Sequence, residues 1–557
     1  MLNKLGTTHN RLRVITLLIP IVFFILITRL FYWMILRGPE LQAMSDRQHQ
    51  MVTILKAKRG NILDSDGGIL AGTKNLYHLF IYKPQLVIPD NDLIEQLLSS
   101  LTPDQEASTE GDLRKYLHDR LSLSSKWVSL KHYLSAEEKE KIESNKIAGL
   151  GFEDEYVRFY PESSMAAQIL GFVGQDAAGQ EQGYFGIEGY FDRLLKGREG
   201  KIRTEKDGEG NPILIGNYQF LHAVEGKSIN TTVDKKVQYL VENMLKEGLA
   251  RYGASAGNVI VMEVSTGKVR AMAAYPNYDP GKFSDFSKSV YKNPMTSDLF
   301  EPGSIFKPLV MAAALNEKTV TPETQCDICS GPIIIGKYSI KTWDEKYYPL
   351  LNMTNVIVHS DNTGMVFAAR KLGPDKFSNY LKKYGFGSKT GIEIQEEVAG
   401  TIRDGKEYGD IDLATNSFGQ GIAITPIQMI TALNTIANNG KYISPTLIDG
   451  STPVTWEVLG PEAVSQITQI MVTAVDTGEA KWAKPVGMSV AGKTGTAQIP
   501  IEGHYDPQKT IASFIGFFPA QNPRYTMLVS LREPQTSQWG SETAAPLWFG
   551  IAKQLLL

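Results

Sequence analysis

Two residues that could act as a nucleophile and its base stand three positions apart. Ser304 and Lys307 lie in "EPGSIFKPLV", directly ahead of the apolar run "LVMAAALNEK". If a helix begins here, positions i and i+3 share one face and the amine reaches the hydroxyl. Burial of that helix would lower the pKa of the lysine, and a neutral Lys307 could accept the proton of Ser304. The stretch therefore predicts an acyl-serine centre, with N–H groups at the helix N-terminus available to an oxyanion.

Two later motifs could complete this centre. One puts a second hydroxyl beside an amide, and the other puts a cation beside hydroxyls at the end of a predicted strand. The residues are Ser360 and Asn362 in "HSDNTG", and Lys493, Thr494, Gly495 and Thr496 in "AGKTGTAQ". Taken alone, each motif is also typical of a capped turn or a plain strand end. The order S-x-x-K, S-x-N, K-T-G is specific, because it is a known signature of serine acyl-transfer sites.

Each motif has a second copy that its surroundings argue against. "SVYK" (289–292) is followed by Asn293-Pro294, which would stop a helix, and no apolar run follows it. "SIN" (228–230) precedes the nucleophile, and the "KTG" at 389–391 comes after the glycine-rich "YGFGS". We therefore assign the chemistry to the copies named first.

An apolar run near the N-terminus predicts a membrane anchor. Residues 14–36, "VITLLIPIVFFILITRLFYWMIL", are almost wholly apolar. At 1.5 Å per residue, a helix of this length crosses a bilayer core of about 30 Å. Lys4, Arg11 and Arg13 precede the run, so the positive-inside bias keeps residues 1–13 cytoplasmic and exports the rest. A cleaved signal peptide is the alternative, disfavoured because the run is long and "LRGPE" offers no small-residue cleavage site.

The composition argues against several classes of protein. With a formal net charge of −3 on 557 residues, the chain shows no sign of binding nucleic acid. The eight histidines show no HExxH or His-x-His spacing, so we expect no metal and no cofactor. Cys326 and Cys329 lack the partner pair of a zinc site, and the predicted compartment is oxidising. We expect a local disulfide or two unpaired structural thiols, with a redox-active pair as the alternative.

The pattern along the chain indicates a domain boundary near residue 226. "RGNILDSDGGILA" (59–71) predicts strand, turn, strand, and residues 90–150 are polar with a helical pattern. Beyond the boundary, residues 235–253 predict an amphipathic helix. Residues 257–275 predict a hairpin that turns at Ser265-Thr266-Gly267. Trp343 and the pair Tyr347-Tyr348 could line a substrate groove or simply pack.

The three motifs together resemble those of the penicillin-binding proteins, and the chain is similar to the class B, monofunctional members. The resemblance covers nearly the whole chain, including "RGNILDSDG", "RFYPESSMAAQILGFVG", "GIEGYFDRLLKGREG", "TTVDKKVQ" and "FGQGIAITPIQM". "YPNYDP", "FEPGSIFKP" and "GKTGTAQ" are most like the cell-division branch. Ser65 and Ser164 depart from the family pattern, where many members have a basic residue and a glycine. Both lie outside the catalytic motifs and bear on docking partners.

The resemblance implies a role for each site residue. Ser304 attacks the carbonyl of a D-Ala–D-Ala stem peptide, and Lys307 takes its proton. Ser360 relays a proton to the leaving D-Ala amine, and Lys493 eases that transfer. Asn362 hydrogen-bonds the substrate amide and helps to fix Lys307.

The resemblance also implies how the substrate is held and released. Thr494 and Thr496, on either side of Gly495, hold the terminal carboxylate, and the N–H groups of Ser304 and Thr496 form the oxyanion hole. An amine from a neighbouring peptidoglycan stem peptide then resolves the acyl-enzyme and makes the cross-link. β-Lactam antibiotics acylate the same serine.

The implied architecture is α+β. Residues 1–13 form a cytoplasmic segment, 14–36 a single-pass anchor, 37–226 an elongated pedestal of the dimerisation type, and 227–557 a transpeptidase domain. That last domain resembles the serine β-lactamases, with an antiparallel sheet flanked by helices, and lies outside the cytoplasm. No glycan-polymerising domain is evident, so the family implies a membrane-embedded glycan polymerase as partner within a cell-wall-synthesis complex.

Two other functions compete with this one. A D,D-carboxypeptidase or β-lactamase would resolve the acyl-enzyme with water, but such enzymes are commonly smaller and lack the pedestal. A β-lactam sensor or a non-catalytic division scaffold is an alternative of another class. A sensor needs a signalling domain across the membrane, where only about 13 residues are expected. A scaffold need not keep all three motifs.

Overall fold

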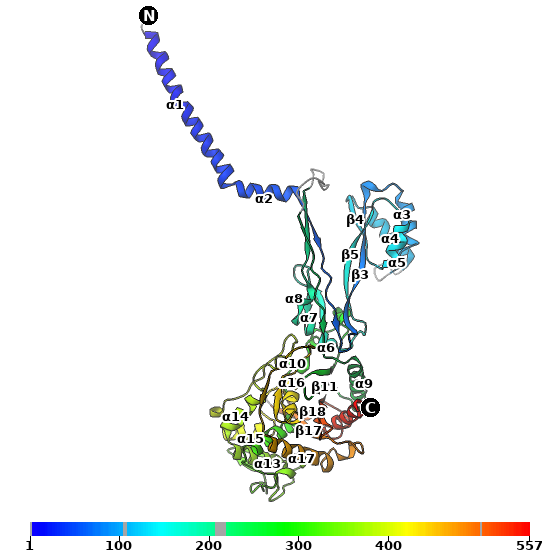
Figure 1. Cartoon of the computed structure of the whole chain (residues 1–557), viewed down its shortest axis with the longest axis vertical. Coiled ribbons are helices and arrows are strands. Elements are labelled where there is room, and N and C mark those ends of the chain that lie inside the picture. The colour runs from blue at the N-terminus through cyan, green and yellow to red at the C-terminus, as the bar shows by residue number, and fades with distance from the viewer. Residues whose placement is uncertain (1–2, 104–108, 206–218, 502–503, 557) are drawn as a thin grey trace. The chain divides into compact units, whose positions relative to one another are not determined.

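The computed structural model describes residues 3–103, 109–205, 219–501 and 504–556. The chain divides into two compact units, Met1–Lys58 with Gly197–Glu225, and Arg59–Lys196 with Gly226–Leu557. Figure 1 labels the main elements of both. Every residue of the three motifs belongs to the second unit.

The first unit contains the predicted anchor. Helix α1 (Asn3–Phe31) continues into the π-helical turn η1 (Tyr32–Leu36), and α2 (Gly38–His49) follows. Residues 14–36 are exposed throughout, and their helix is long and apolar enough to cross a membrane. The predicted helix is therefore confirmed. The side chains of residues 1–13 lie outside the described set, so the basic residues there remain a sequence observation.

The first unit also contains a three-stranded antiparallel sheet. Its strands are β1 (Gln50–Leu55), β8 (Gly200–Glu205) and β9 (Gln219–Leu221), with β8 in the middle. β1 and β8 pair over six residues each, from Gln50 opposite Glu205 to Leu55 opposite Gly200.

The part of the second unit before residue 197 is built on the long strand β3 (Ile69–Tyr82). β3 pairs antiparallel with β2 (Ile62–Leu63), β4 (Trp127–Leu134) and β5 (Leu150–Phe159). The leucine-rich core beside it includes residues of helices α3 (Asp90–Leu98), α4 (Glu110–Leu121) and α5 (Ala136–Ser144). The predicted strand, turn, strand at residues 59–71 is confirmed, with Asp64 Oδ1 accepting the Gly68 N–H at 2.7 Å.

The expectation of helices throughout residues 90–150 is wrong at β4. Val128 and Leu130 of this strand are buried in the core with the helices, and Ser129 and Lys131, which point to the opposite face of the strand, are buried as well. Lys131 and His132, which lie between the apolar residues, are typical of the exposed face of a helix. Pairing with β3 overrides that local preference.

Separate segments of this region meet in a buried ion cluster. Glu188 is fully buried and accepts hydrogen bonds from Arg59 Nε at 2.8 Å and Arg158 Nε at 2.6 Å. Arg59 Nη1 also donates to Asp192 Oδ1 at 2.7 Å. Charges at this depth are stable only when paired. The cluster thus joins the loop before β2, the end of β5 and the short helices α7 (Gly186–Tyr190) and α8 (Asp192–Lys196).

The C-terminal part of the second unit is organised around a five-stranded antiparallel sheet. Its order is β12 (Val269–Tyr275), β11 (Ala256–Glu263), β19 (Tyr525–Arg532), β18 (His504–Phe518), β17 (Ala491–Ile501). The predicted hairpin of β11 and β12 is confirmed, with Val259 opposite Ala273. The sheet separates two cores, because alternate strand residues face opposite sides.

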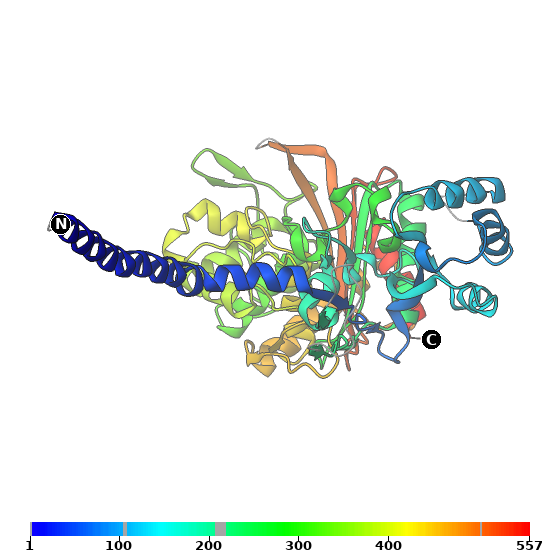
Figure 2. The same ribbon diagram turned by 90° about the horizontal axis from the view of Figure 1, so that it is seen from above.

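Helices cover both faces of this sheet, as Figure 2 shows. Val259 and Val261 pack in a core with α9 (Lys235–Tyr252) and α18 (Ala544–Leu555), while Ile260 and Met262 belong to a larger core on the other side. The helices with residues in that larger core include α11 (Lys307–Asn316), α12 (Met353–Val358), α13 (Asn362–Leu372), α14 (Pro374–Lys383), α15 (Asp410–Ser417), α16 (Pro426–Ala437) and α17 (Pro461–Thr477). This arrangement confirms the α+β fold with an antiparallel sheet flanked by helices.

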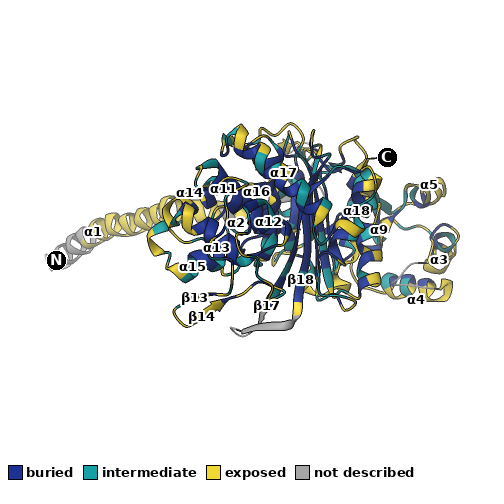
Figure 3. Cartoon of the chain, turned by 90° about the horizontal axis from the view of Figure 1, so that it is seen from below, coloured by how far each residue is buried: buried dark blue, intermediate teal, exposed yellow. Residues whose placement is uncertain are grey.

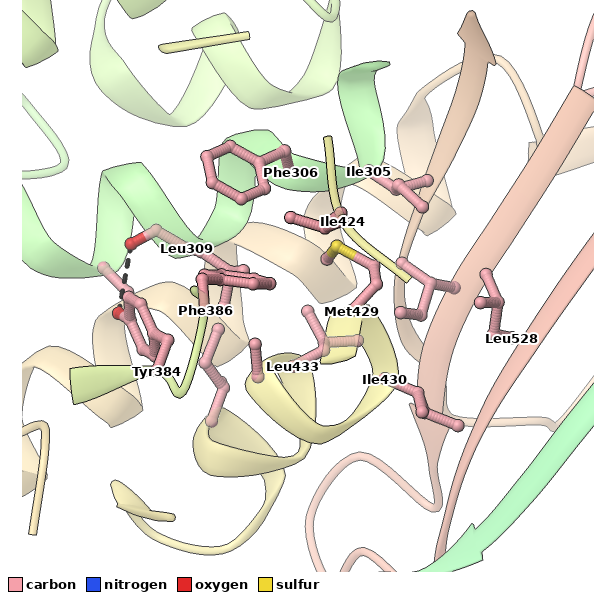
Figure 4. Packing of buried hydrophobic residues seen from close by; sticks show 14 of the residues in the cluster. Ile305, Phe306, Leu309, Tyr384, Phe386, Ile424, Met429, Ile430, Leu433 and Leu528 are labelled. Atoms are coloured by element: carbon pink, nitrogen blue, oxygen red, sulfur yellow. Dashed lines mark hydrogen bonds between the residues drawn. The ribbon is translucent and has the colours of Figure 1, made fainter. Parts of the chain in front are cut away.

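The helix that follows Ser304 lies deep in the larger core. Figure 3 shows α11 and α16 in the colour of buried residues, and residues 307–315 of α11 are all buried. Figure 4 shows Phe306 and Leu309 packed among residues of α16 and Phe386. The hydroxyl of Tyr384 donates to the Leu309 carbonyl at 3.1 Å. This packing fixes the position of Lys307 at the first turn of α11.

Candidate active site

Ser304 lies in a tight turn that leads into α11. The 3₁₀ turn η5 (Gly303–Phe306) ends where α11 begins, at Lys307, and Pro308 occupies the first turn, where its missing N–H matters least. Gly303 has φ +57°, and a Cβ there would lie 3.2 Å from that of Ala497. The turn therefore needs glycine directly before the serine.

Ser304 borders a cleft of about 240 Å³. Residues from all three motifs meet there, together with two tryptophans whose rings lie 5.0 Å apart. The lining includes Ser304, Asn362, Thr496, Gln498, Trp343 and Trp539. The alternative left open for Trp343 is thereby decided, because it lines the cleft while its indole N–H donates to the His359 carbonyl at 3.1 Å.

Lys307 is fully buried and held by the second motif. Its Nζ donates to the Ser360 carbonyl at 2.5 Å, to Ser360 Oγ at 3.2 Å and to Asn362 Oδ1 at 2.8 Å. Burial, together with the charge of Lys493, holds the pKa of Lys307 well below its ordinary value. A lysine with a lowered pKa is neutral at a lower pH than an ordinary lysine and can then act as a base.

The sequence predicts direct contact between Lys307 and Ser304, and the structure differs on this point. Among the described residues, the hydrogen-bond partners of Lys307 Nζ are Ser360 and Asn362, and Ser304 Oγ is not one of them. The three acceptors in the second motif draw the amine toward α13. Catalytic hydrogen bonds often tighten only when substrate is bound.

The second motif is held by a strained turn between α12 and α13. Ser360 has φ +54°, a conformation that a serine rarely adopts and that stores about 1–3 kcal/mol. Asp361 caps α13, with Oδ1 accepting the Gly364 N–H at 2.8 Å. Asn362 Nδ2 donates to the Lys341 carbonyl at 2.9 Å. These bonds aim Ser360 Oγ and Asn362 Oδ1 at the same amine.

The third motif lies on β17, the strand at the end of the sheet. Lys493 is buried, and its Nζ donates to the carbonyl and the hydroxyl oxygen of Thr494, each at 3.1 Å. Thr496 Oγ1 accepts the Gly540 N–H at 3.0 Å. A Cβ at Gly495 would come within 2.8 Å of Ile305 Cγ2, so glycine is what lets β17 approach the Ser304 turn.

Glu479 is a neighbour of the site that the motif search missed. Its Oε2 accepts the Thr494 hydroxyl at 3.3 Å. Burial lowers the pKa of Lys493, and the negative charge of Glu479 partly offsets this effect. Glu479 follows directly on the end of α17, and nothing in the sequence nearby resembles a motif.

The residues of the second motif copies do not share the environment of the active-site residues. Ser289 is exposed, and its hydroxyl lies 2.9 Å from that of Ser287. Lys292 pairs with Glu396 at 3.3 Å. In the earlier K-T-G copy, Thr390 donates to Glu397 at 2.6 Å.

Two further features bear on the predictions for this region. Cys326 and Cys329 form a disulfide and are buried, which confirms the local disulfide and rules out the two unpaired thiols. Within the described ranges, no group of three or more His, Cys, Asp or Glu side chains is placed to hold a metal ion.

Family models match both large parts of the chain. Residues 257–557 match the penicillin binding protein transpeptidase domain. Residues 54–231 match the penicillin-binding protein dimerisation domain.

Curated proteins and solved structures resemble the chain over most of its length. Stage V sporulation protein D of Bacillus subtilis is 30% identical, covering 99% of this chain and 86% of that protein. A peptidoglycan D,D-transpeptidase FtsI of Buchnera aphidicola is 28% identical over 97% of this chain and 93% of that protein. The structure of penicillin binding protein 2X from Streptococcus thermophilus is 26% identical with a TM-score of 0.78, covering 91% of this chain and 80% of that one. Penicillin binding protein 3 from Mycobacterium tuberculosis, complexed with aztreonam, shares the fold at 23% identity and a TM-score of 0.68, over 90% of this chain and 96% of that one.

Proposed function

This chain belongs to the class B penicillin-binding proteins, and on that premise we propose that it is a peptidoglycan D,D-transpeptidase whose nucleophile is Ser304. The observation that carries the assignment of residues is the environment of Lys307. This lysine is fully buried, its pKa is lowered, and it lies one turn from a serine that lines the cleft. A neutral amine in that position supports proton removal from Ser304.

Acylation follows from this arrangement. Ser304 Oγ forms a bond to the penultimate D-Ala carbonyl carbon and passes its proton to Lys307. The C–N bond to the terminal D-Ala then breaks, and the leaving amine takes a proton from Ser360 Oγ, which Lys307 restores. The hydrogen bond between Lys307 and Ser360 supports this relay. The N–H groups of Ser304 and Thr496 would stabilise the oxyanion.

The charge of Lys493 supports both binding and proton transfer. Lys493 Nζ donates to the hydroxyl oxygen of Thr494. The hydroxyls of Thr494 and Thr496 would together hold the terminal carboxylate of the donor peptide. Asn362 accepts a hydrogen bond from Lys307 through its side-chain oxygen. It also lines the cleft, where it can hydrogen-bond to the substrate amide. A second stem peptide then provides the amine that resolves the acyl-serine, and β-lactams compete for the same serine.

We place the enzyme in the cell membrane, anchored by α1 and η1. Residues 1–13 would lie in the cytoplasm, 14–36 in the bilayer, 37–226 in the pedestal and 227–557 in the transpeptidase domain. The positive charges before the anchor support this orientation. The two matched family models describe a dimerisation domain and a transpeptidase domain, so we propose a membrane-embedded glycan polymerase as partner.

Intact mass of the full-length protein in detergent, after incubation with benzylpenicillin, tests the assignment of Ser304. The wild type should gain the mass of one drug molecule, and Ser304→Ala should gain none. Ser289→Ala, which changes the serine of the other S-x-x-K copy, is the matched control and should be labelled like the wild type. Labelling of Ser304→Ala would refute the assignment.

A further inference from the structure

A second cavity, of about 150 Å³, adjoins the active site. Trp343 lines both this cavity and the cleft of Ser304. Other residues of the cavity lining lie next to the three motifs in the sequence or contact a residue of one of them. They are Thr342, Asp344, His359, Asp361 and Glu479.

Two buried polar atoms of this lining have no hydrogen-bond partner among the described residues. They are Asp361 Oδ2 and Thr342 Oγ1, on side chains whose residues are 1% and 5% exposed. The other carboxylate oxygen of Asp361 is occupied by the N–H of Gly364 and the hydroxyl of Thr363. An unpaired buried polar group is unfavourable, so this pair of atoms fits a ligand that brings N–H donors.

The charges around the cavity favour a cation. Asp344, Asp361 and Glu479 are three carboxylates, and the lysine that also lines the cavity, Lys346, lies 3.7 Å from Asp344. His359 stacks on Tyr348 at 4.7 Å. An alkylammonium group carries positive charge and several N–H donors, and therefore suits this lining.

We propose that this cavity receives the primary ammonium group of the amine acceptor before it attacks the acyl-serine, an inference that rests on the proposed transpeptidase function. The amine of an acceptor peptide is protonated at neutral pH. Donor hydrogen bonds to Asp361 Oδ2 and Thr342 Oγ1 would hold it beside the second motif.

The position agrees with the direction of the reaction. By microscopic reversibility, the acceptor amine attacks from the place that the leaving D-Ala amine has vacated, next to Ser360. Asp361 directly follows Ser360, and Glu479 contacts Thr494, so the cavity borders that place. Toward Lys493 the surroundings become positive, which favours loss of a proton from the ammonium.

The second half-reaction then balances as follows. The ammonium gives one proton to solvent as it leaves the carboxylates. The neutral amine forms a C–N bond to the acyl carbon, and the C–O bond to Ser304 breaks. The second amine proton passes through Ser360 Oγ to Ser304 Oγ, which restores the free serine.

The test measures how the acyl-enzyme divides between amine and water. The full-length protein in detergent is given an N-acyl-D-alanyl thioester as donor and D-alanine as amine, and the dipeptide and the free acid are quantified by mass spectrometry. In Thr342→Val, the D-alanine concentration for half-maximal dipeptide should rise about fivefold, as expected for one lost hydrogen bond. Thr342→Ser should stay near the wild type, because it keeps the hydroxyl.

The controls separate this inference from the proposed function. Thr342→Val exchanges an unpaired hydroxyl for a methyl group, so its fold should be retained. Thr435→Val makes the same exchange at another buried, unpaired threonine, on α16 and away from the cavity, and should change nothing. Acylation by benzylpenicillin should match the wild type in all three variants.

Several outcomes would overturn the inference. One is an unchanged dipeptide yield in Thr342→Val, and another is an equal loss in Thr435→Val. A loss of benzylpenicillin acylation in Thr342→Val would give the residue a role in donor chemistry instead. Formation of free acid alone by the wild type would also overturn it. If the wild type were not acylated at all, the proposed function itself would fail.

Discussion

Two groups of buried charged side chains in the second unit, one around Glu188 and one in the active site, differ in how their charge is compensated. Before residue 197, Glu188 is fully buried between Arg59 and Arg158, and each guanidinium donates to its carboxylate. Opposite charges at hydrogen-bond distance compensate one another. Such a cluster holds distant segments of the chain together.

The active site buries two lysines without such compensation. No ion pair within the described residues includes Lys307 or Lys493, and both have lowered pKa values because they are buried. The partners of Lys307 are neutral oxygens of Ser360 and Asn362. The comparison teaches that paired buried charges hold distant segments together, whereas Lys307, whose partners are neutral oxygens, becomes a reactive neutral amine.

The largest expected effect comes from removing the reactive amine. Lys307→Met keeps the length and apolar stem of the side chain but deletes the base. The second-order rate of acylation by benzylpenicillin should fall about 10³-fold, within the range for loss of a general base. Stopped-flow or quenched labelling of the full-length protein checks it, and a fall of less than tenfold would contradict the assigned role.

Breaking the compensated cluster should instead reduce stability. Glu188→Gln leaves Arg59 and Arg158 without their buried counter-charge and should destabilise the second unit by about 3 kcal/mol. Thermal unfolding followed by circular dichroism checks it. Acylation of the folded protein well below its melting temperature should stay within twofold, and a large change there would mean that the two regions are not separate.

The pH dependence of stability should differ between the two regions. Burial lowers the native pKa of Lys307, so between the native and the unfolded pKa the lysine is protonated in the unfolded chain but not in the native one. Since the unfolded state then binds more protons, the unfolding free energy rises with pH between the native and the unfolded pKa.

Lys307→Met should remove one such contribution, which is at most about 1.4 kcal/mol per pH unit. The melting temperature of the wild type, measured from pH 6 to pH 10, should rise more steeply with pH, or fall less steeply, than that of the variant. Equal slopes would show that Lys307 has the same protonation in both states.

The smallest effect is expected at the lysine that shares the motif spacing but not the burial. Lys292 pairs with Glu396 at the surface, with 57% of its side chain exposed. Lys292→Met should leave acylation and melting temperature unchanged within error, since exposed ion pairs contribute little. A loss of acylation here would show that the spacing alone, without burial, creates reactivity.

The sequence predicted those parts of the fold in which local pattern and tertiary structure agree. The anchor helix, the amphipathic helix α9 and the β11–β12 hairpin have a clear periodicity or turn, and all are present. β4 was missed because its polar residues read as a helix surface until they are paired with β3. The ion cluster of Glu188 joins positions more than 100 residues apart, which no local pattern reveals.

For the site, motif order identified residues that the structure brings together, but not how they bond. The sequence placed Lys307 against Ser304, while in the structure its amine is bonded to Ser360 and Asn362. The positive φ of Ser360 and the contact of Glu479 with Thr494 arise from packing between distant segments. Such bonds depend on distances that a single sequence does not contain.

The most direct test of the account is the pH dependence of acylation, because its central claim is that burial makes Lys307 a neutral base. The rate constant for benzylpenicillin with the full-length protein would be measured from pH 6 to pH 10.5. We predict that the rate reaches its plateau well below the ordinary lysine value of 10.5. A rate that keeps rising tenfold per pH unit up to that value would contradict the account, because Lys307 would then be an ordinary protonated lysine.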